Sequence, residues 1–260
     1  MNSYSQSMMW TVLVFSLVCI NRTSLAPGNN APIRQEEGRQ IPVLCYHHVY
    51  TDMKGHAPAY SISLHNFRAQ LKMLADSNFH VISPDQLYDH LCCAAKLPDK
   101  PVLLTFDDGN QEQATLVAPL LDSMGYKATF FIMTVTIGKP RYLSAAQIAT
   151  LSAHGHVIGA HTWDHPDCRT QTVKDWPVQL GKPKQALEHI TGKPVVYLAW
   201  PFGAWNEAAV SAVKQYEYKA AFQLAGKPGE TPGLYTIRRL MVAGNWGGTE
   251  LYNEMLRTFK

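Results

Sequence analysis

Two adjacent carboxylates, Asp107 and Asp108, follow a short apolar run in the segment LLTFDDGNQ. Two like charges side by side raise each other's pKa, so the pair is unfavourable unless a cation lies next to it. The run at residues 102–106 has the composition of a buried strand, and Gly109 bounds it. Whether the pair serves chemistry therefore depends on other ligands for a cation.

A second pair of candidate ligands follows in the segment HVIGAHTWDHP, where His161 and His165 are four positions apart. On a helical turn, side chains at i and i+4 share one face, so both imidazoles could reach one cation. One aspartate and two histidines make a three-ligand set that leaves room for water, as catalytic metal sites require. The second carboxylate can then stay free as a base.

Each motif alone has a common structural explanation. Asp-Gly pairs form turns and helix caps, and two histidines at this spacing are more often surface or core residues than ligands. Both motifs, however, directly follow predicted strands in an alternating pattern. Together they predict a metal site.

The elements that must position these residues alternate along the chain. Apolar runs predict strands at residues 41–46, 79–82, 102–106, 128–132, 157–160, 195–199, 220–223 and 235–242. Apolar spacing and start signals such as Ser83-Pro84 predict helices at residues 64–77, 84–91, 115–124, 144–153, 179–191 and 207–215. This order is typical of an α/β fold with a parallel sheet or barrel, whose sites lie at the C-terminal ends of strands.

The composition suits one globular domain. The chain has 260 residues, of which 46% are hydrophobic and 17% charged, with a net charge of +3. So small a positive charge, spread along the chain, does not indicate a nucleic-acid partner. We expect the cysteines after the N-terminal segment, Cys45, Cys92, Cys93 and Cys168, to be mostly buried thiols.

The N-terminal segment has a different character. Residues 8–20 form an uncharged apolar run, and Ser24-Leu25-Ala26 follows as a small-x-small pattern. We interpret residues 1–26 as a signal peptide, with an N-terminal membrane anchor as the alternative. Residues 27–40 are predicted to be a linker, and residues 41–260 the folded domain. This organisation predicts a secreted or periplasmic protein, with membrane association through the N-terminus as a variant of it.

The two motifs carry a family resemblance. TFDDG at 105–109 and HTWDH at 161–165 resemble the first two motifs of the polysaccharide deacetylases, the NodB-homology or carbohydrate esterase family 4 enzymes. Further segments resemble the branch that deacetylates poly-β-1,6-N-acetyl-D-glucosamine; they lie at residues 41–49, 60–74, 128–132 and 198–206. The resemblance implies a distorted (β/α) barrel in a single domain and an N-acetylglucosamine polysaccharide as partner.

The resemblance also assigns roles. Asp107 would be the general base, and Asp108, His161 and His165 would hold a divalent metal. The backbone N–H of Phe202, in the segment WPFG, would help to hold the oxyanion. Two imidazoles and a carboxylate suit Zn²⁺, although Co²⁺, Ni²⁺ and Fe²⁺ accept the same ligands.

The sequence departs from the broader family in two places. The family's third motif carries an arginine that orients the catalytic aspartate, and that position here aligns with Ala199 or Trp200. The poly-N-acetylglucosamine branch shares this loss. The family's C-terminal acid histidine is also missing, because the last histidine is His189. His47 or His48 is the candidate substitute, and either could instead be a core residue.

Contacts with a sugar chain are less defined. Stacking platforms could come from one or two of Trp163, Trp200, Trp205 and Trp246, and we favour Trp163 and Trp205, with Pro201 beside them as a further contact. Arg238 and Arg239 either pair with an acid of the site or cap a strand. The alternatives to deacetylation of the β-1,6 polymer are deacetylation of chitin, peptidoglycan or xylan, and a carbohydrate-binding pseudoenzyme. Oligomeric state stays open.

Overall fold

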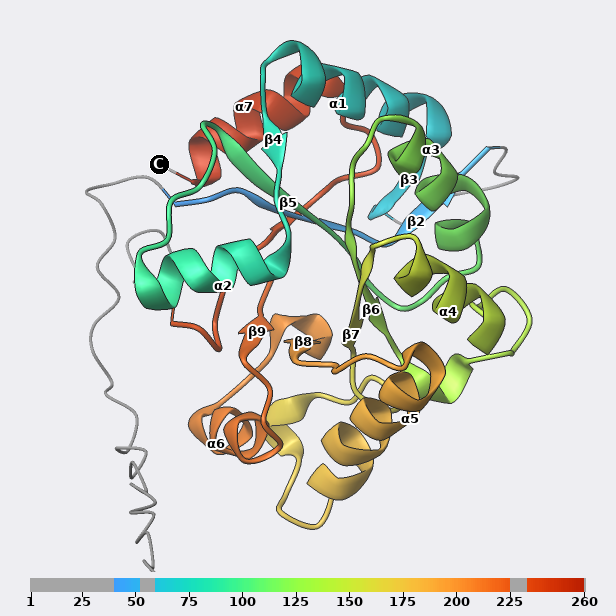
Figure 1. Ribbon diagram of the computed structural model, residues 1–260, viewed down its shortest axis with the longest axis vertical. Helices are drawn as coiled ribbons and strands as arrows, with labels where there is room; N and C mark the ends of the chain where they lie inside the picture. Colours follow the sequence, from blue (N-terminus) through green and yellow to red (C-terminus); the bar gives the residue numbers. More distant parts are fainter. Residues whose placement is uncertain (1–39, 52–58, 225–232, 260) are drawn as a thin grey trace, which may run out of the picture. The chain divides into compact units, whose positions relative to one another are not determined.

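A curled parallel sheet surrounded by helices forms the centre of the protein (Figure 1). In the computed structural model the described residues are 40–51, 59–224 and 233–259, all within one compact unit. The predicted signal peptide or anchor, and all but the last residue of the predicted linker, lie outside the described residues. The strands across the sheet are, in order, β10 (Leu240–Met241), β1 (Val43–Tyr46), β5 (Pro101–Phe106), β6 (Thr129–Ile132), β7 (Val157–Ala160), β8 (Tyr197–Ala199) and β9 (Ala220–Phe222), and β4 (His80–Val81) pairs with β5.

Helices alternate with the strands along the chain as the sequence predicts, except for the last helix, which follows β10 and is not predicted. They are α1 (Leu64–Asp76), α2 (Pro84–Cys93), α3 (Ala118–Ser123), α4 (Ala145–Ala153), α5 (Lys182–Thr191), α6 (Glu207–Gln215) and α7 (Gly248–Thr258). Ser83 and Ser144 begin α2 and α4 with capping boxes, each exchanging hydrogen bonds with a glutamine three residues later. Single turns of π-helix at Gln113–Val117 and Pro177–Gly181 lead into α3 and α5.

Three elements are missing from the sequence-based prediction. Helix α7 buries little apart from Leu251 and Met255, and it begins at Gly247 without a side-chain oxygen as its cap. The parallel pair β2 (His48–Tyr50) and β3 (Ser61–Ser63) has only three residues per strand. Such short patterns carry too few apolar positions to reveal a period.

The two faces of the sheet have different roles. Alternate residues of the strands face the helices and join the larger apolar cluster, among them Leu44, Leu104, Phe130 and Ile158. The positions between them form a smaller cluster inside the curl, among them Val43, Leu103, Phe131, Tyr197 and Phe222. Because side chains alternate along a strand, the inner positions that follow this cluster at the C-terminal ends point to one shared space.

One segment brings the two edges of the sheet together. Ile237 bridges to Phe222 of β9, and three residues later Leu240 pairs with Leu44 of β1. The segment between them therefore spans the gap between the first and last strands, which makes the fold a distorted (β/α) barrel, as expected. It also places Arg239 on the inner side, where its guanidinium is fully buried.

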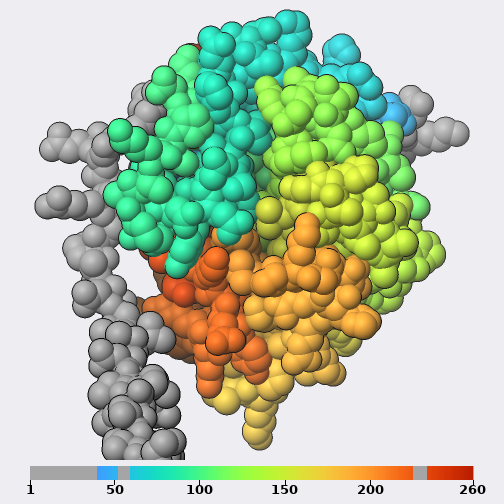
Figure 2. Space-filling model, viewed as in Figure 1, coloured from blue at the N-terminus to red at the C-terminus, as the bar shows by residue number. Residues whose placement is uncertain are grey.

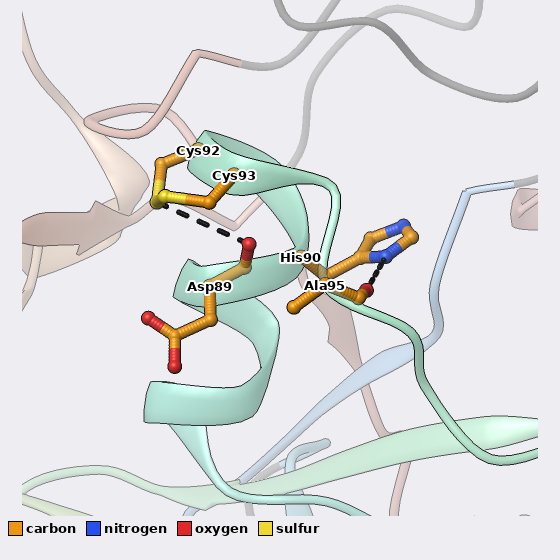
Figure 3. Close-up of a disulfide and its surroundings, with 5 residues drawn as sticks. All are labelled: Asp89, His90, Cys92, Cys93 and Ala95. Carbon is orange, nitrogen blue, oxygen red and sulfur yellow. Dashed lines mark hydrogen bonds between the residues drawn. A yellow bond between two sulfur atoms is a disulfide. The ribbon is translucent and has the colours of Figure 1, made fainter.

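The prediction of mostly buried thiols is correct for only two of the four cysteines. Cys45 and Cys168 are buried and free. Cys92 and Cys93, however, are exposed at the end of α2, where they are joined in a disulfide (Figure 3). The two side chains lie at a helix end on the surface, where there is no core for them to contact. Composition alone does not show that position, so it could not predict that they are exposed.

The N-terminal ends of the strands lie away from the two sequence motifs. A cavity of about 480 Å³ there is lined by residues of α2, β7 and β8, which include Asp85, Val157 and Tyr197. Figure 2 shows this side of the folded unit in space-filling form, with the teal, yellow and orange segments that contain these elements in contact. Within the described ranges, none of the helices is long and apolar enough to cross a membrane.

Candidate active site

The two carboxylates lie at the C-terminal end of β5 and point in different directions. Asp107 continues the strand, since its N–H donates to the Tyr46 carbonyl at 2.9 Å, and its side chain is buried inside the barrel. Asp108 has a left-handed backbone (φ 73°), and Gly109 follows at φ 75°. A Cβ at Gly109 would lie 3.2 Å from Ile132 Cγ2, so this turn requires glycine.

Asp108 meets both histidines of the second motif. Its Oδ1 lies 3.6 Å from His161 Nε2 and 3.9 Å from His165 Nε2, and the three donor atoms lie within 4.8 Å of one another. Nitrogen and oxygen ligands of a tetrahedral Zn²⁺ ion are about 3.3 Å apart. The donor set therefore fits a divalent cation after a small contraction.

A backbone contact sets the tautomer of His161. Its Nδ1 lies 2.8 Å from the Ala199 carbonyl oxygen, which can only accept a hydrogen bond. Nδ1 must therefore carry the proton, and Nε2 presents its lone pair toward Asp108. Carbonyl contacts of this kind orient metal-binding histidines in many proteins.

The expectation of a helical turn for the two histidines is wrong. Residues 161–165 form a loop after β7, in which Thr162 and His165 both have left-handed backbones (φ 62° and 64°). The His165 N–H donates to the Thr162 hydroxyl oxygen at 3.1 Å. This turn, rather than helical periodicity, brings the two imidazole centroids to 4.7 Å.

Asp107 is held by Arg239 through a two-point ion pair. The two guanidinium nitrogens donate to Oδ1 and Oδ2 at 2.7 Å each. Burial favours a higher pKa for Asp107, but the charge and hydrogen bonds of Arg239 outweigh it and keep the pKa below its ordinary value. Asp107 is therefore an ionised carboxylate in a fixed orientation, and its Oδ2 lies 3.8 Å from His161 Nε2.

Of the two neighbouring arginines, only Arg239 reaches the site. Arg238, which is also a candidate site residue from the sequence, instead donates to the Gln40 side chain at 2.9 Å. The two alternate along an extended segment, so their side chains leave on opposite sides. Sequence position alone could not say which one faces inward.

The structure also separates His47 from His48. His47 lies near Asp107 and Asp108, and burial lowers its pKa while those carboxylates act to raise it. His48 Nδ1 instead contacts Glu112 at 2.8 Å, and that hydrogen bond raises the His48 pKa. His47 is therefore the histidine that β1 brings to the paired carboxylates.

The third segment, at residues 201–205, lies beside His165. Phe202 has a left-handed backbone (φ 57°), and its ring centroid lies 4.4 Å from that of His165. Its N–H has no backbone carbonyl partner within the described ranges, which leaves it free to donate to a ligand. Pro201 is buried and offers little surface to a ligand.

One of the four candidate tryptophans is exposed, and the other three are buried or half-buried. Trp163, between the histidines, is 37% exposed, whereas Trp200 is fully buried and donates to the Tyr235 carbonyl. Trp205 is half-buried and donates to the Gln223 side chain at 2.8 Å, and Trp246 packs against the core. Trp163 thus has the most open ring of the four.

Two buried residues of the site have no signal in the sequence. The Gln113 amide donates to the carbonyl of Asp107 at 2.6 Å and to that of His47 at 3.3 Å, joining two strand ends. The Cys45 thiol donates to Asp107 Oδ2 at 3.5 Å. Cys45 is revealed only by the inward direction of its position in β1, and Gln113 only by the π-helical turn that begins with it.

A polar cavity opens beside this cluster. It measures about 430 Å³, and its lining includes His48, Asn110, Glu112, Arg141 and Tyr142. The cavity adjoins the turn that carries Asp108, so a long ligand could extend from the carboxylates into it.

A model of the family described as polysaccharide deacetylase matches residues 94–221, which include both motifs. The chain belongs to the polysaccharide deacetylase family. YxkH of Bacillus subtilis is 25% identical over 221 residues, covering 85% of this chain and 77% of its own. A chitin deacetylase of Pestalotiopsis is 36% identical over 110 residues, which are 42% of this chain and 37% of that protein.

Solved deacetylase structures share the fold. The Streptococcus pyogenes deacetylase PplD matches with a TM-score of 0.77 and 23% identity, covering 85% of this chain and 98% of that one. IcaB from Ammonifex degensii matches with a TM-score of 0.68 and 25% identity, covering 79% and 92%. Family membership makes this deacetylase domain a hydrolase of amide bonds, and its residues offer a triad that can hold the metal on which the family depends.

Proposed function

We propose that this protein is a metal-dependent N-deacetylase of an extracellular N-acetylglucosamine polymer, and that the polymer is β-1,6-linked. The observation that carries the proposal is the arrangement of the carboxylates. Asp108 meets His161 and His165 at ligand distances, while Asp107 stays outside that set and is oriented by Arg239. A protein that only bound sugar would not need the second, separately held carboxylate.

The residues divide the chemistry between them. A divalent ion held by Asp108, His161 and His165 would polarise the acetamide carbonyl and lower the pKa of a bound water. Asp107 faces the same space as an ionised carboxylate, so it can take the proton from the attacking water. Zn²⁺ suits these donors, and Co²⁺, Ni²⁺ and Fe²⁺ accept them too.

Two further groups would complete the reaction. The Phe202 N–H can donate to the carbonyl oxygen as it becomes negatively charged. His47 lies beside Asp107 and is the candidate to give a proton to the leaving amine. The products would be acetate and a free glucosamine residue in the polymer.

The choice of polymer rests on sequence features. Residues 41–49 and 198–206 resemble the branch that acts on poly-β-1,6-N-acetyl-D-glucosamine, and the third-motif arginine is absent, as in that branch. Arg239 holds Asp107 from a different segment, so loss of that arginine does not leave the base unsupported. The similarity to a chitin deacetylase supports the wider class of N-acetylated polymers and makes chitin the second candidate.

We also propose that residues 1–26 direct the protein to the periplasm or outside the cell. Residues 8–20 are apolar and uncharged, and the polymer in question is extracellular. N-terminal sequencing of protein recovered outside the cytoplasm tests this. A new N-terminus near residue 27 supports export with cleavage, and an intact N-terminus in the membrane fraction supports the anchor.

Acetate release from defined polymers tests the function. We expect release from β-1,6-linked N-acetylglucosamine oligomers and little from chitin oligomers, peptidoglycan or acetylated xylan. Acetate from chitin but none from the β-1,6 polymer would reject the proposed linkage.

The variant Asp107→Asn separates an enzyme from a sugar-binding pseudoenzyme. The amide keeps the shape of the side chain but cannot accept the proton, so we expect acetate release to fall on the order of a hundredfold or more. Equal background release from the parent and the variant would instead support a binding protein.

A further inference from the structure

A second group of metal-ligand side chains lies beside the triad. Cys45, His47 and Asp107 each offer one donor atom, and these atoms lie within 4.8 Å of one another. They come from β1, from the residue shortly after it and from the end of β5, all on the inner side of the barrel. The group shares no residue with Asp108, His161 and His165.

The distances match those between ligands of one ion. Cys45 Sγ lies 3.5 Å from Asp107 Oδ2 and 4.0 Å from His47 Nδ1. A tetrahedral Zn²⁺ with a bond of about 2.3 Å to sulfur and about 2.0 Å to oxygen or nitrogen separates such ligands by about 3.5 Å. The sulfur and carboxylate oxygen are therefore already at the spacing that a shared ion requires.

We propose that Cys45, His47 and Asp107 form a second, weaker zinc site, and that an ion bound there blocks the deacetylase. On binding, the Cys45 S–H bond breaks, its proton passes to solvent, and the ion takes the place of that proton between Sγ and Oδ2. No electron is transferred.

The ion pair with Arg239 explains why this site must be the weaker one. Arg239 donates to both oxygens of Asp107, but each carboxylate oxygen can accept two contacts, so Oδ2 keeps room for a ligand bond. The positive guanidinium nevertheless opposes a nearby cation. Among the described residues, no arginine or lysine bonds to Asp108 of the triad, so the triad fills first.

An ion at this second site would block the deacetylase because two of its ligands, Asp107 and His47, are the proposed base and acid. This step rests on the proposed function. An ion on Asp107 takes the lone pair that would accept the proton from water, and an ion on His47 holds the candidate acid. We therefore expect zinc to restore activity of the chelated protein at low concentration and to inhibit it at higher concentration.

Cobalt titration of the chelated protein tests the site without any substrate. We expect the parent to bind two Co²⁺ ions, and the second to bring near-ultraviolet absorption from a cobalt–thiolate bond. Cys45→Ser should bind one ion without that absorption, since a hydroxyl is a poor ligand for these metals. Cys168→Ser, which alters the other buried free thiol, should keep both ions and the absorption.

The activity arm uses zinc, with each variant compared with its own maximum. Cys45→Ser should raise the zinc concentration for half-inhibition by about tenfold or more, while Cys168→Ser leaves it unchanged. One bound Co²⁺ in the parent, or thiolate absorption that persists in Cys45→Ser, would overturn the proposal. Counting bound metal ions requires no deacetylase activity. If the protein released no acetate, the proposed function would be rejected, but the cobalt titration would still show whether the second site exists.

Discussion

Asp107 and Asp108, at the end of β5, lie in different environments although they are adjacent in the chain. Asp107 is buried against Arg239 and stays ionised, whereas Asp108 turns through a left-handed backbone toward two histidines. Arg239 thus offsets the charge of Asp107, and a metal ion held with the two histidines would offset that of Asp108. TFDDG reveals the pair from sequence, but the partner of Asp107 comes from more than a hundred residues away and has no motif of its own.

Replacing Arg239 by lysine should remove the fork that fixes Asp107. Lysine keeps the charge but cannot donate to both oxygens in one plane, so the proposed base Asp107 loses its orientation. We expect kcat for acetate release to fall on the order of tenfold to a hundredfold with little change in KM.

Arg238→Lys is the matched control, because Arg238 contacts Gln40 rather than the site. It should keep the parent kcat. Equal losses in both variants, or a metal content that falls in Arg239→Lys, would indicate a general structural role instead of positioning.

Loops at the strand ends, rather than the strands themselves, complete the site. Asp108, Thr162, His165 and Phe202 all have left-handed backbones, a conformation that costs free energy and gathers at functional sites. Hydrophobic periodicity located β5 and β7 correctly, since each is a continuous apolar run. Periodicity does not give the loop geometry, so the predicted helical turn for the two histidines is wrong.

Glycine at position 109 should be essential to the turn between the carboxylates. Alanine there would combine a positive φ with a Cβ 3.2 Å from Ile132, so we expect a loss of about 1–3 kcal/mol in unfolding free energy and weaker metal binding. Urea unfolding and metal titration measure both effects.

Gly125→Ala serves as the control that separates the effect of the Ile132 contact from that of the positive φ. Gly125 has a similar φ of 71°, but its added Cβ would meet nothing within 4 Å. It should cost less stability and leave metal binding unchanged. A loss at Gly125 as large as that at Gly109 would show that the contact with Ile132 does not matter.

Across the whole domain, local patterns predict the alternation of strands and helices, but they do not predict how the closing segment pairs with the two edges of the sheet. Most strands are apolar runs that the sequence shows directly, but the segment from Ile237 to Leu240 contains two arginines and touches both sheet edges through short pairings. Its register depends on strands nearly two hundred residues earlier, which no local pattern records. The arginine that the site needs enters through this least regular part of the fold.

Stability should fall in acid because of a histidine buried outside the site. Burial lowers the pKa of His156 to about 4, against the opposing charge of Asp122, while in the unfolded chain it is about 6.5. Between pH 6.5 and 4, His156 is therefore mostly protonated in the unfolded chain but neutral in the folded protein, so stability falls as the pH is lowered. Between pH 7 and 4.5 the parent should lose about 2 kcal/mol more than His156→Gln, as measured by urea unfolding.

The opposite pH trend, or equal losses in the parent and His156→Gln, would show that His156 is not kept neutral by the fold. The Ala128 N–H donates to His156 Nδ1 at 3.2 Å, and the amide oxygen of the substituted side chain can still accept that hydrogen bond. The variant therefore tests the proton rather than the contact.

Metal-restored acetate release tests the central claim most directly. The protein is stripped with a chelator, one equivalent of Zn²⁺ or Co²⁺ is added back, and acetate release from β-1,6-linked N-acetylglucosamine oligomers is followed for the parent and for His165→Ala. The triad predicts that the stripped parent is inactive, that one equivalent restores it, and that His165→Ala binds the ion weakly and stays inactive. Release that persists without metal, or a His165→Ala variant restored to parental activity by the same equivalent, would contradict the account.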